Sequence, residues 1–146
     1  MNKNPKVPNP HILSFYTNEA AKCMKSRANF TSCVMLASLL EYILMIAYDA
    51  LPVSASKHKA SKRPDLFSLI SIAQKEGWIS MNNLDKHVDS IRLARELVST
   101  DKLVEYFENN KELPVIGIEV SQVLASSVSE VIKNLTGAMV EKDSNK

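Results

Sequence analysis

Histidine and cysteine are the residue types in this 146-residue chain with the widest catalytic and metal-binding chemistry, and their spacing builds no recognisable site. His11, His58 and His87 lie far apart, without the H-x-x-x-H or C-x-x-C spacing of a zinc site. Cys23 and Cys33 lie ten residues apart on two expected helices, and neither has a histidine close to it in sequence. We therefore expect two small buried thiols in a reducing, cytoplasmic compartment, with no catalytic residue and no metal.

Phosphate-binding motifs are missing from the sequence as well. The chain has three glycines in total, and it contains no G-x-G-x-x-G, no G-x-x-x-x-G-K and no G-x-S-x-G pattern. Because a loop that cradles phosphate needs several glycines close together, the sequence disfavours the common nucleotide-dependent enzymes. We expect no cofactor.

Two charged residues in apolar surroundings are the most informative positions. Glu41 interrupts the apolar run from Val34 to Leu51, and Arg95 falls on the apolar stripe of a later helix. An unpaired ion in a dry interior costs several kcal/mol, so we expect the two side chains to meet. In one interpretation they form an interior or subunit-interface ion pair that fixes helix register. In the other, Arg95 lines a polar cleft with Arg92 and binds phosphate.

A basic segment connects the two halves of the chain. Between Val53 and Pro64 no large apolar residue occurs, which is typical of a solvated loop. Its cations could contact an RNA backbone or a protein partner, although no aromatic residue is interleaved to stack on bases. The five residues are Lys57, His58, Lys59, Lys62 and Arg63.

Apolar residues recur at helical spacing along most of the chain and predict the elements that position these side chains. Pro52, Asp65 and Gly77 mark helix ends. Asn83 or Asp85 opens the fourth helix, whose stripe is Leu84, Val88, Ile91 and Val98. The expected helices are 11–27, 30–51, 66–76, the fourth one to about Val98, a short one within 100–114, and a last one after Pro114 that ends near Gly137.

The predicted fold is all-α, an up-and-down bundle of four main helices plus short extra helical segments, with the second helix at its centre. Hydrophobic residues make up 45% of the chain, which suffices for a core, and the scarcity of glycine argues against a many-stranded fold. We expect a flexible lead-in over 1–10, one helical domain over 11–137 and a frayed tail over 138–146. The net charge of +2 demands no nucleic acid, and Glu41 and Asp49 argue against a membrane span at Val34–Leu51.

The order of these features resembles the HEPN superfamily of small helical domains. The matching stretches are NEAAKCM (18–24), ASLLEYILMIAYDAL (37–51), LFSLISIAQKEGWIS (66–80) and SIRLARELVSTDK (90–102). In that family the fourth helix carries an Arg-Asn dipeptide and then a histidine, with four to six residues between the arginine and the histidine. The resemblance implies metal-independent RNA cleavage by this arginine and histidine across a dimer cleft, with histidine moving the proton near neutral pH.

This chain departs from the family motif at the position that matters for catalysis. Arg95 matches the arginine, but Glu96 stands in place of asparagine and Thr100 in place of the nearest histidine. The function that the sequence predicts is therefore a non-enzymatic HEPN-like interaction module, a homodimer that could also hold a second protein partner. The alternative is an RNA-binding protein or residual ribonuclease that uses Arg92, Arg95 and the basic segment 57–63.

Overall fold

The computed structural model describes residues 7–53, 64–80, 83–110, 112 and 115–144, and every regular element in these ranges is helical. The all-α prediction is therefore confirmed for the described part of the chain. Its α-helices are α1 (Pro10–Lys25), α2 (Asn29–Ala50), α3 (Leu66–Glu76), α4 (Val88–Glu96), α5 (Thr100–Asn109) and α6 (Ile118–Ser144), and a 3-10 helix, Asn83–His87, leads into α4.

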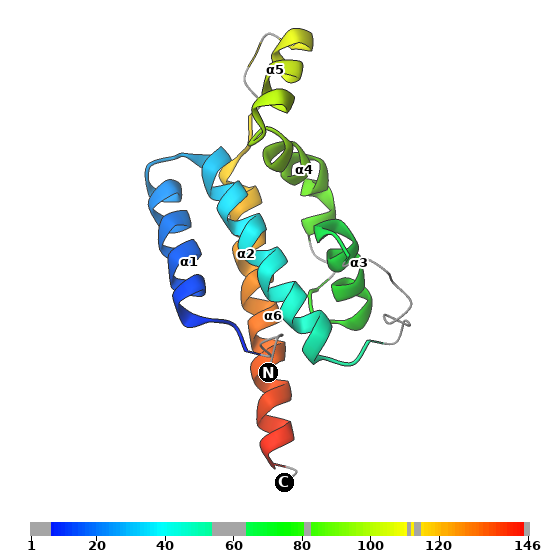
Figure 1. The fold of residues 1–146 in the computed structure, drawn as a ribbon. Coiled ribbons are helices and arrows are strands. Elements are labelled where there is room, and N and C mark those ends of the chain that lie inside the picture. Colours follow the sequence, from blue (N-terminus) through cyan, green and yellow to red (C-terminus); the bar gives the residue numbers. More distant parts are fainter. Residues whose placement is uncertain (1–6, 54–63, 81–82, 111, 113–114, 145–146) are drawn as a thin grey trace.

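The second helix is the centre of the molecule, as the sequence predicts. It packs along α6 and α1, while α3 and α4 lie on the side of α2 away from α1 (Figure 1). Within the described residues α2 is the one helix long and apolar enough to cross a membrane, and a core helix of this kind passes the same test. The core residues of α2 are Ser32, Cys33, Leu36, Ala37, Leu39, Leu40, Ile43, Leu44, Ile46 and Ala47.

The finer prediction of four main helices running up and down is not confirmed in that form. The elements between α2 and α6 are short, and α5 extends beyond the end of the bundle instead of packing along it (Figure 1). Among the described residues, α2 and α6 form the longest helix pair. The arrangement is a central pair of long helices with shorter helices on two sides.

Small residues allow α2 and α6 to approach closely. Ser32 of α2 and Ser121 of α6 are both fully buried, and their hydroxyl oxygens are 2.6 Å apart in a hydrogen bond. The Ser32 hydroxyl also donates to the carbonyl oxygen of Asn29. Each buried hydroxyl therefore has a partner, which removes the cost of leaving a polar group unsatisfied in the core.

Both ends of α3 form as the sequence predicts. The Asp65 carboxylate accepts a hydrogen bond from the backbone N–H of Ser68 at 2.8 Å and caps the N-terminus. At the other end Gly77 adopts φ +80°, a left-handed conformation that glycine takes without strain. Trp78 and Ile79 follow directly and are buried.

Removing the Asp65 cap is expected to lower the free energy of unfolding by about 1 kcal/mol near neutral pH. The Ser68 N–H holds the pKa of Asp65 below its ordinary value of 3.8, so the carboxylate stabilises the fold above that pH. The stabilisation is lost as the pH falls through the lowered pKa. Urea unfolding of Asp65→Ala should therefore show a deficit at about pH 7 that shrinks towards about pH 3. Asp65→Asn is the matched control, because asparagine also caps; an equal deficit in both variants would contradict this assignment.

The fourth helix differs from its prediction at both ends. Residues 83–87 form a 3-10 helix, and α4 itself ends at Glu96. Leu97 turns inward and is buried, whereas Val98, which the sequence placed on the apolar stripe, is 64% exposed. The prediction failed because the seven-residue spacing from Ile91 to Val98 assumes an unbroken helix, and the chain turns at Leu97.

The two chain ends differ from the sequence prediction in smaller ways. The first helix begins at Pro10 and ends at Lys25, where the prediction was 11–27. The last helix continues through Gly137 to Ser144, so 138–144 is helical and not a frayed tail. A single glycine inside a helix costs about 1 kcal/mol relative to alanine and does not have to end it. Residues 1–6 of the predicted lead-in lie outside the described residues.

Candidate functional site

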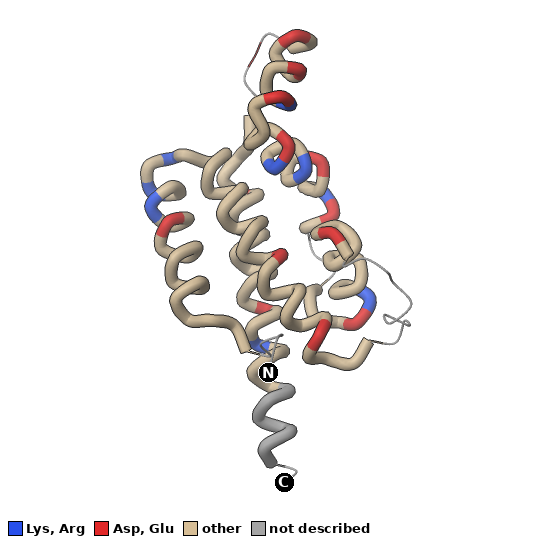
Figure 2. Tube along the Cα trace, in the orientation of Figure 1, with Lys and Arg blue, Asp and Glu red and all other residues tan. Residues whose placement is uncertain are grey.

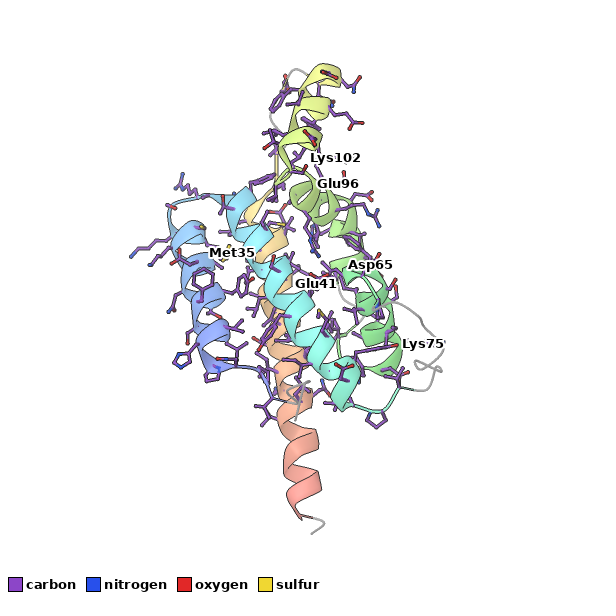
Figure 3. The ribbon with its side chains drawn as sticks, in the orientation of Figure 1. Met35, Glu41, Asp65, Lys75, Glu96 and Lys102 are labelled. Carbon is purple, nitrogen blue, oxygen red and sulfur yellow. The ribbon has the colours of Figure 1, made fainter. Side chains whose placement is uncertain are left out.

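The structure brings Glu41 and Arg95 together. Arg95 Nη2 of α4 donates to Glu41 Oε1 of α2 over 3.0 Å, across 54 positions of sequence. Glu41 lies near the middle of α2 (Figure 3). The pair ties the short helix α4 to the central helix by a charge-assisted hydrogen bond, which is among the stronger polar contacts in proteins.

The pair is nearer the surface than the sequence implies. The side chains of Arg95 and Glu41 are 30% and 29% exposed, so neither ion lies in the dry interior. The interior form of the predicted ion pair is therefore corrected, and the subunit-interface form stays a prediction. The reason is that α4 lies at the edge of the bundle, where the apolar stripe carries Arg95 only to the rim of the core.

Arg92 makes different contacts. Its guanidinium lies 4.5 Å from the centre of the Phe67 ring on α3, a cation–π contact. Its Nη1 is 3.6 Å from Asp89 Oδ1 within α4, and its side chain is 49% exposed. Arg92 thus braces α4 against α3, while Arg95 is held by Glu41. The two arginines that the sequence placed in a common phosphate cleft have separate partners.

An outward stripe of α2 surrounds Glu41. Five residues at spacings of four, three, four and three share one side of the helix and are each partly exposed; we call them the α2 face. This is the heptad spacing with which one helix packs against another. The members are Val34, Ser38, Glu41, Met45 and Tyr48. The sequence could not single out this face, because α2 is apolar almost all round; Glu41 was its one signal.

The described histidines and cysteines are not part of this site. His87 occupies the N-cap position of α4 without a side-chain capping hydrogen bond, eight residues before Arg95, which corresponds to about 12 Å along a helix. In the described residues neither Glu41 nor Arg95 is paired with a histidine. Cys33 is buried, and desolvation raises the pKa of its thiol to about 11, so it stays protonated. No cluster of three His, Cys, Asp or Glu side chains suited to a metal ion occurs in these residues.

Two cavities in the described part of the chain have both charged and apolar lining residues. One cavity, of about 180 Å³, lies between α4 and α5, and its lining includes Glu96, Lys102 and Glu105. Figure 3 labels Glu96 and Lys102 at this place. Another, of about 390 Å³, lies beside Trp78 and Lys133. The lining residues of these two cavities include no cysteine or histidine.

The predicted basic contact site belongs to the segment that connects α2 and α3. Lys57, His58, Lys59, Lys62 and Arg63 lie outside the described residues. The described site therefore consists of the α2 face and the arginines of α4.

A double-mutant cycle should measure the Glu41–Arg95 interaction directly. We expect Glu41→Gln and Arg95→Met to be coupled by about 1 kcal/mol, between the values for exposed and buried pairs, because both groups still reach water. The measurement is urea unfolding of the wild type, both single variants and the double variant, all in the same oligomeric state. Strict additivity of the two single effects would contradict a direct contact.

Comparison with known proteins returned no match: no family model, no curated protein and no solved structure is significantly similar to this chain.

Proposed function

We propose that this chain is a non-enzymatic, HEPN-like helical interaction module that works as a homodimer. In this proposal the core is a bundle whose main helices are α1, α2, α4 and α6, with α3 and α5 as short additions. Two copies pair through the α2 face, with the Glu41–Arg95 ion pair at the centre of the contact. The two free thiols suit a reducing compartment such as the cytoplasm.

The α2 face is the single observation that carries the proposal. Most proteins turn charged residues outward along a surface helix, but between Val34 and Ala47 the outward side of α2 has Glu41 as its one charge, and Arg95 partly neutralises it. Its partly exposed Met45 and Tyr48 belong to residue types enriched in protein interfaces. A second copy would cover these side chains and further desolvate the ion pair.

The fate of the arginine supports a non-enzymatic role. In the family motif an arginine acts together with a histidine that moves a proton. Arg95 is held by a carboxylate, and Thr100 begins a different helix, α5. The α2 face and the arginines of α4 include no histidine, the side chain that moves protons in the family motif.

An RNA assay tests the proposal against its alternative, an RNA-binding protein or ribonuclease. The purified chain and its Arg95→Ala variant would be incubated with total RNA, with a chelator present and over a series of salt concentrations. We expect intact RNA in all reactions. Cleavage, or salt-sensitive binding, that Arg95→Ala abolishes would overturn the proposal in favour of RNA chemistry at Arg92 and Arg95.

A further inference from the structure

The side chains of the fifth helix are exposed in the described structure, except Tyr106, which is partly buried. It extends past the end of the bundle (Figure 1), and none of its residues is buried. Leu103, Val104 and Phe107 share one face and are 37%, 53% and 41% exposed. Isolated helices shorter than about 12 residues are marginal in water, and α5 has ten residues, so a covering surface would stabilise it.

The apolar surface continues on the segments that lead into and away from α5. Val98 precedes the helix and is 64% exposed, while Val115 and Ile118 follow it and are 93% and 40% exposed. Single exposed apolar residues are common on protein surfaces, but six around one short helix are typical of an interaction site. We call these six residues the α5 patch.

Charge narrows the choice of partner. From Glu96 to Glu119 the sequence has six acidic residues and two lysines, a net charge of −4 in a chain whose total is +2, so the rest of the chain carries +6. Asp101 and Glu108, seven residues apart, lie on the same flank of the α5 patch. Two α5 helices packed antiparallel would set these carboxylates against each other, which disfavours self-pairing of α5.

A surface with the complementary character exists on α1. Phe15 is 57% exposed, and Lys22 and Lys25 lie on the same face of the helix, followed by exposed Arg27. One acidic side chain lies beside these cations: Glu19 Oε1 is 3.4 Å from Lys22 Nζ. These cations lie at the end of the molecule from which α5 extends, and Figure 2 shows blue positions on α1 and red positions along α5. We call this surface the α1 end.

We propose that the α5 patch of one copy docks on the α1 end of the second copy. This inference rests on the proposed homodimer. Because α1 and α4 lie on opposite sides of α2 (Figure 1), a two-fold axis that runs along the α2 face carries α5 of each copy towards α1 of the other. The contact then occurs twice, which is the signature of an isologous dimer. It sets the acidic flank of α5 against the basic flank of α1.

Charge reversal with exchange of partners tests the contact. One variant carries Asp101→Lys and Glu108→Lys, and the other carries Lys22→Glu and Lys25→Glu. Each alone should dimerise about tenfold more weakly in sedimentation equilibrium, since like charges then face each other. An equimolar mixture should form a heterodimer of wild-type affinity, because both of its contacts again join opposite charges. Lys75→Glu is the matched control. Lys75 is an exposed residue of α3, away from both surfaces, so this change should leave the affinity unchanged.

The outcomes separate this inference from the proposal beneath it. A wild type that stays monomeric would refute the homodimer itself. A wild-type dimer whose affinity neither variant changes, or a mixture that does not recover affinity, would overturn the α5–α1 contact and leave the α2 face standing. Loss of binding to a different protein by the α5 variant, with an unchanged dimer, would overturn the contact too and assign the α5 patch to another occupant.

Discussion

Replacing Leu40 by alanine is expected to lower the free energy of unfolding by about 3 kcal/mol. Leu40 lies on the inward side of α2 and is 0% exposed, within the cluster that joins α2 to its neighbours. The change removes buried methyl groups and leaves a cavity that the tightly packed helices can close only in part. Urea denaturation measures the loss, with the same dependence of the unfolding free energy on urea concentration used for both variants.

Leu103→Ala is the control for this prediction, because the chemical change is the same. Leu103 lies on α5 and is 37% exposed, so we expect its removal to change the monomer's stability by less than about 0.5 kcal/mol. Equal losses in the two variants would mean that α5 packs on the core in solution, contrary to the described arrangement. A negligible loss for Leu40→Ala would contradict the central position of α2.

The second large effect is expected from a charge placed on the α2 face. Met45→Glu should weaken the proposed dimer at least about a hundredfold, because an unpaired carboxylate would be buried when two copies meet. The monomer should keep its fold, since Met45 is partly exposed and glutamate there can reach water. Light scattering coupled to size exclusion measures the mass, and circular dichroism confirms that the helices persist.

Ser71→Glu adds the same charge at an exposed position of α3 and serves as the matched control. It should leave the dimer intact. If both variants dimerise like the wild type, the α2 face is not the contact. If both become monomeric, net charge and not position controls the association.

The sequence predicts the positions of most helices because Asp65, Gly77 and the helical spacing of core residues act locally. It misplaces the end of α4, since Leu97 and Val98 both fit an apolar stripe and the turn that buries Leu97 depends on α5 leaving the bundle. The sequence also predicts too short a last helix. Gly137 is typical of a helix end, but α6 continues through it to Ser144. Local patterns cannot say where a helix leaves the body of the fold.

The candidate site is predictable in part for a similar reason. The contact between Glu41 and Arg95 is predictable because an unpaired charge among apolar residues costs free energy. Two apolar helices that each carry one charge avoid this cost when the opposite charges pair. Their 29% and 30% exposure does not follow from sequence, because it depends on α4 lying at the rim of the core. The α2 face could not be predicted because α2 is apolar on almost every side. Such a pattern does not indicate which side of the helix is left exposed.

The most direct test of the account is thiol cross-linking at Ser38, in the α2 face. The variant is Ser38→Cys with Cys23→Ala, and the buried Cys33, whose thiol pKa is raised to about 11, stays unreactive near neutral pH. Ser71→Cys in the same background is the control. The account predicts that a short bifunctional thiol reagent yields a covalent dimer from Ser38→Cys and little from Ser71→Cys. Equal yields from the two, or only monomer from Ser38→Cys, would contradict a homodimer built on the α2 face.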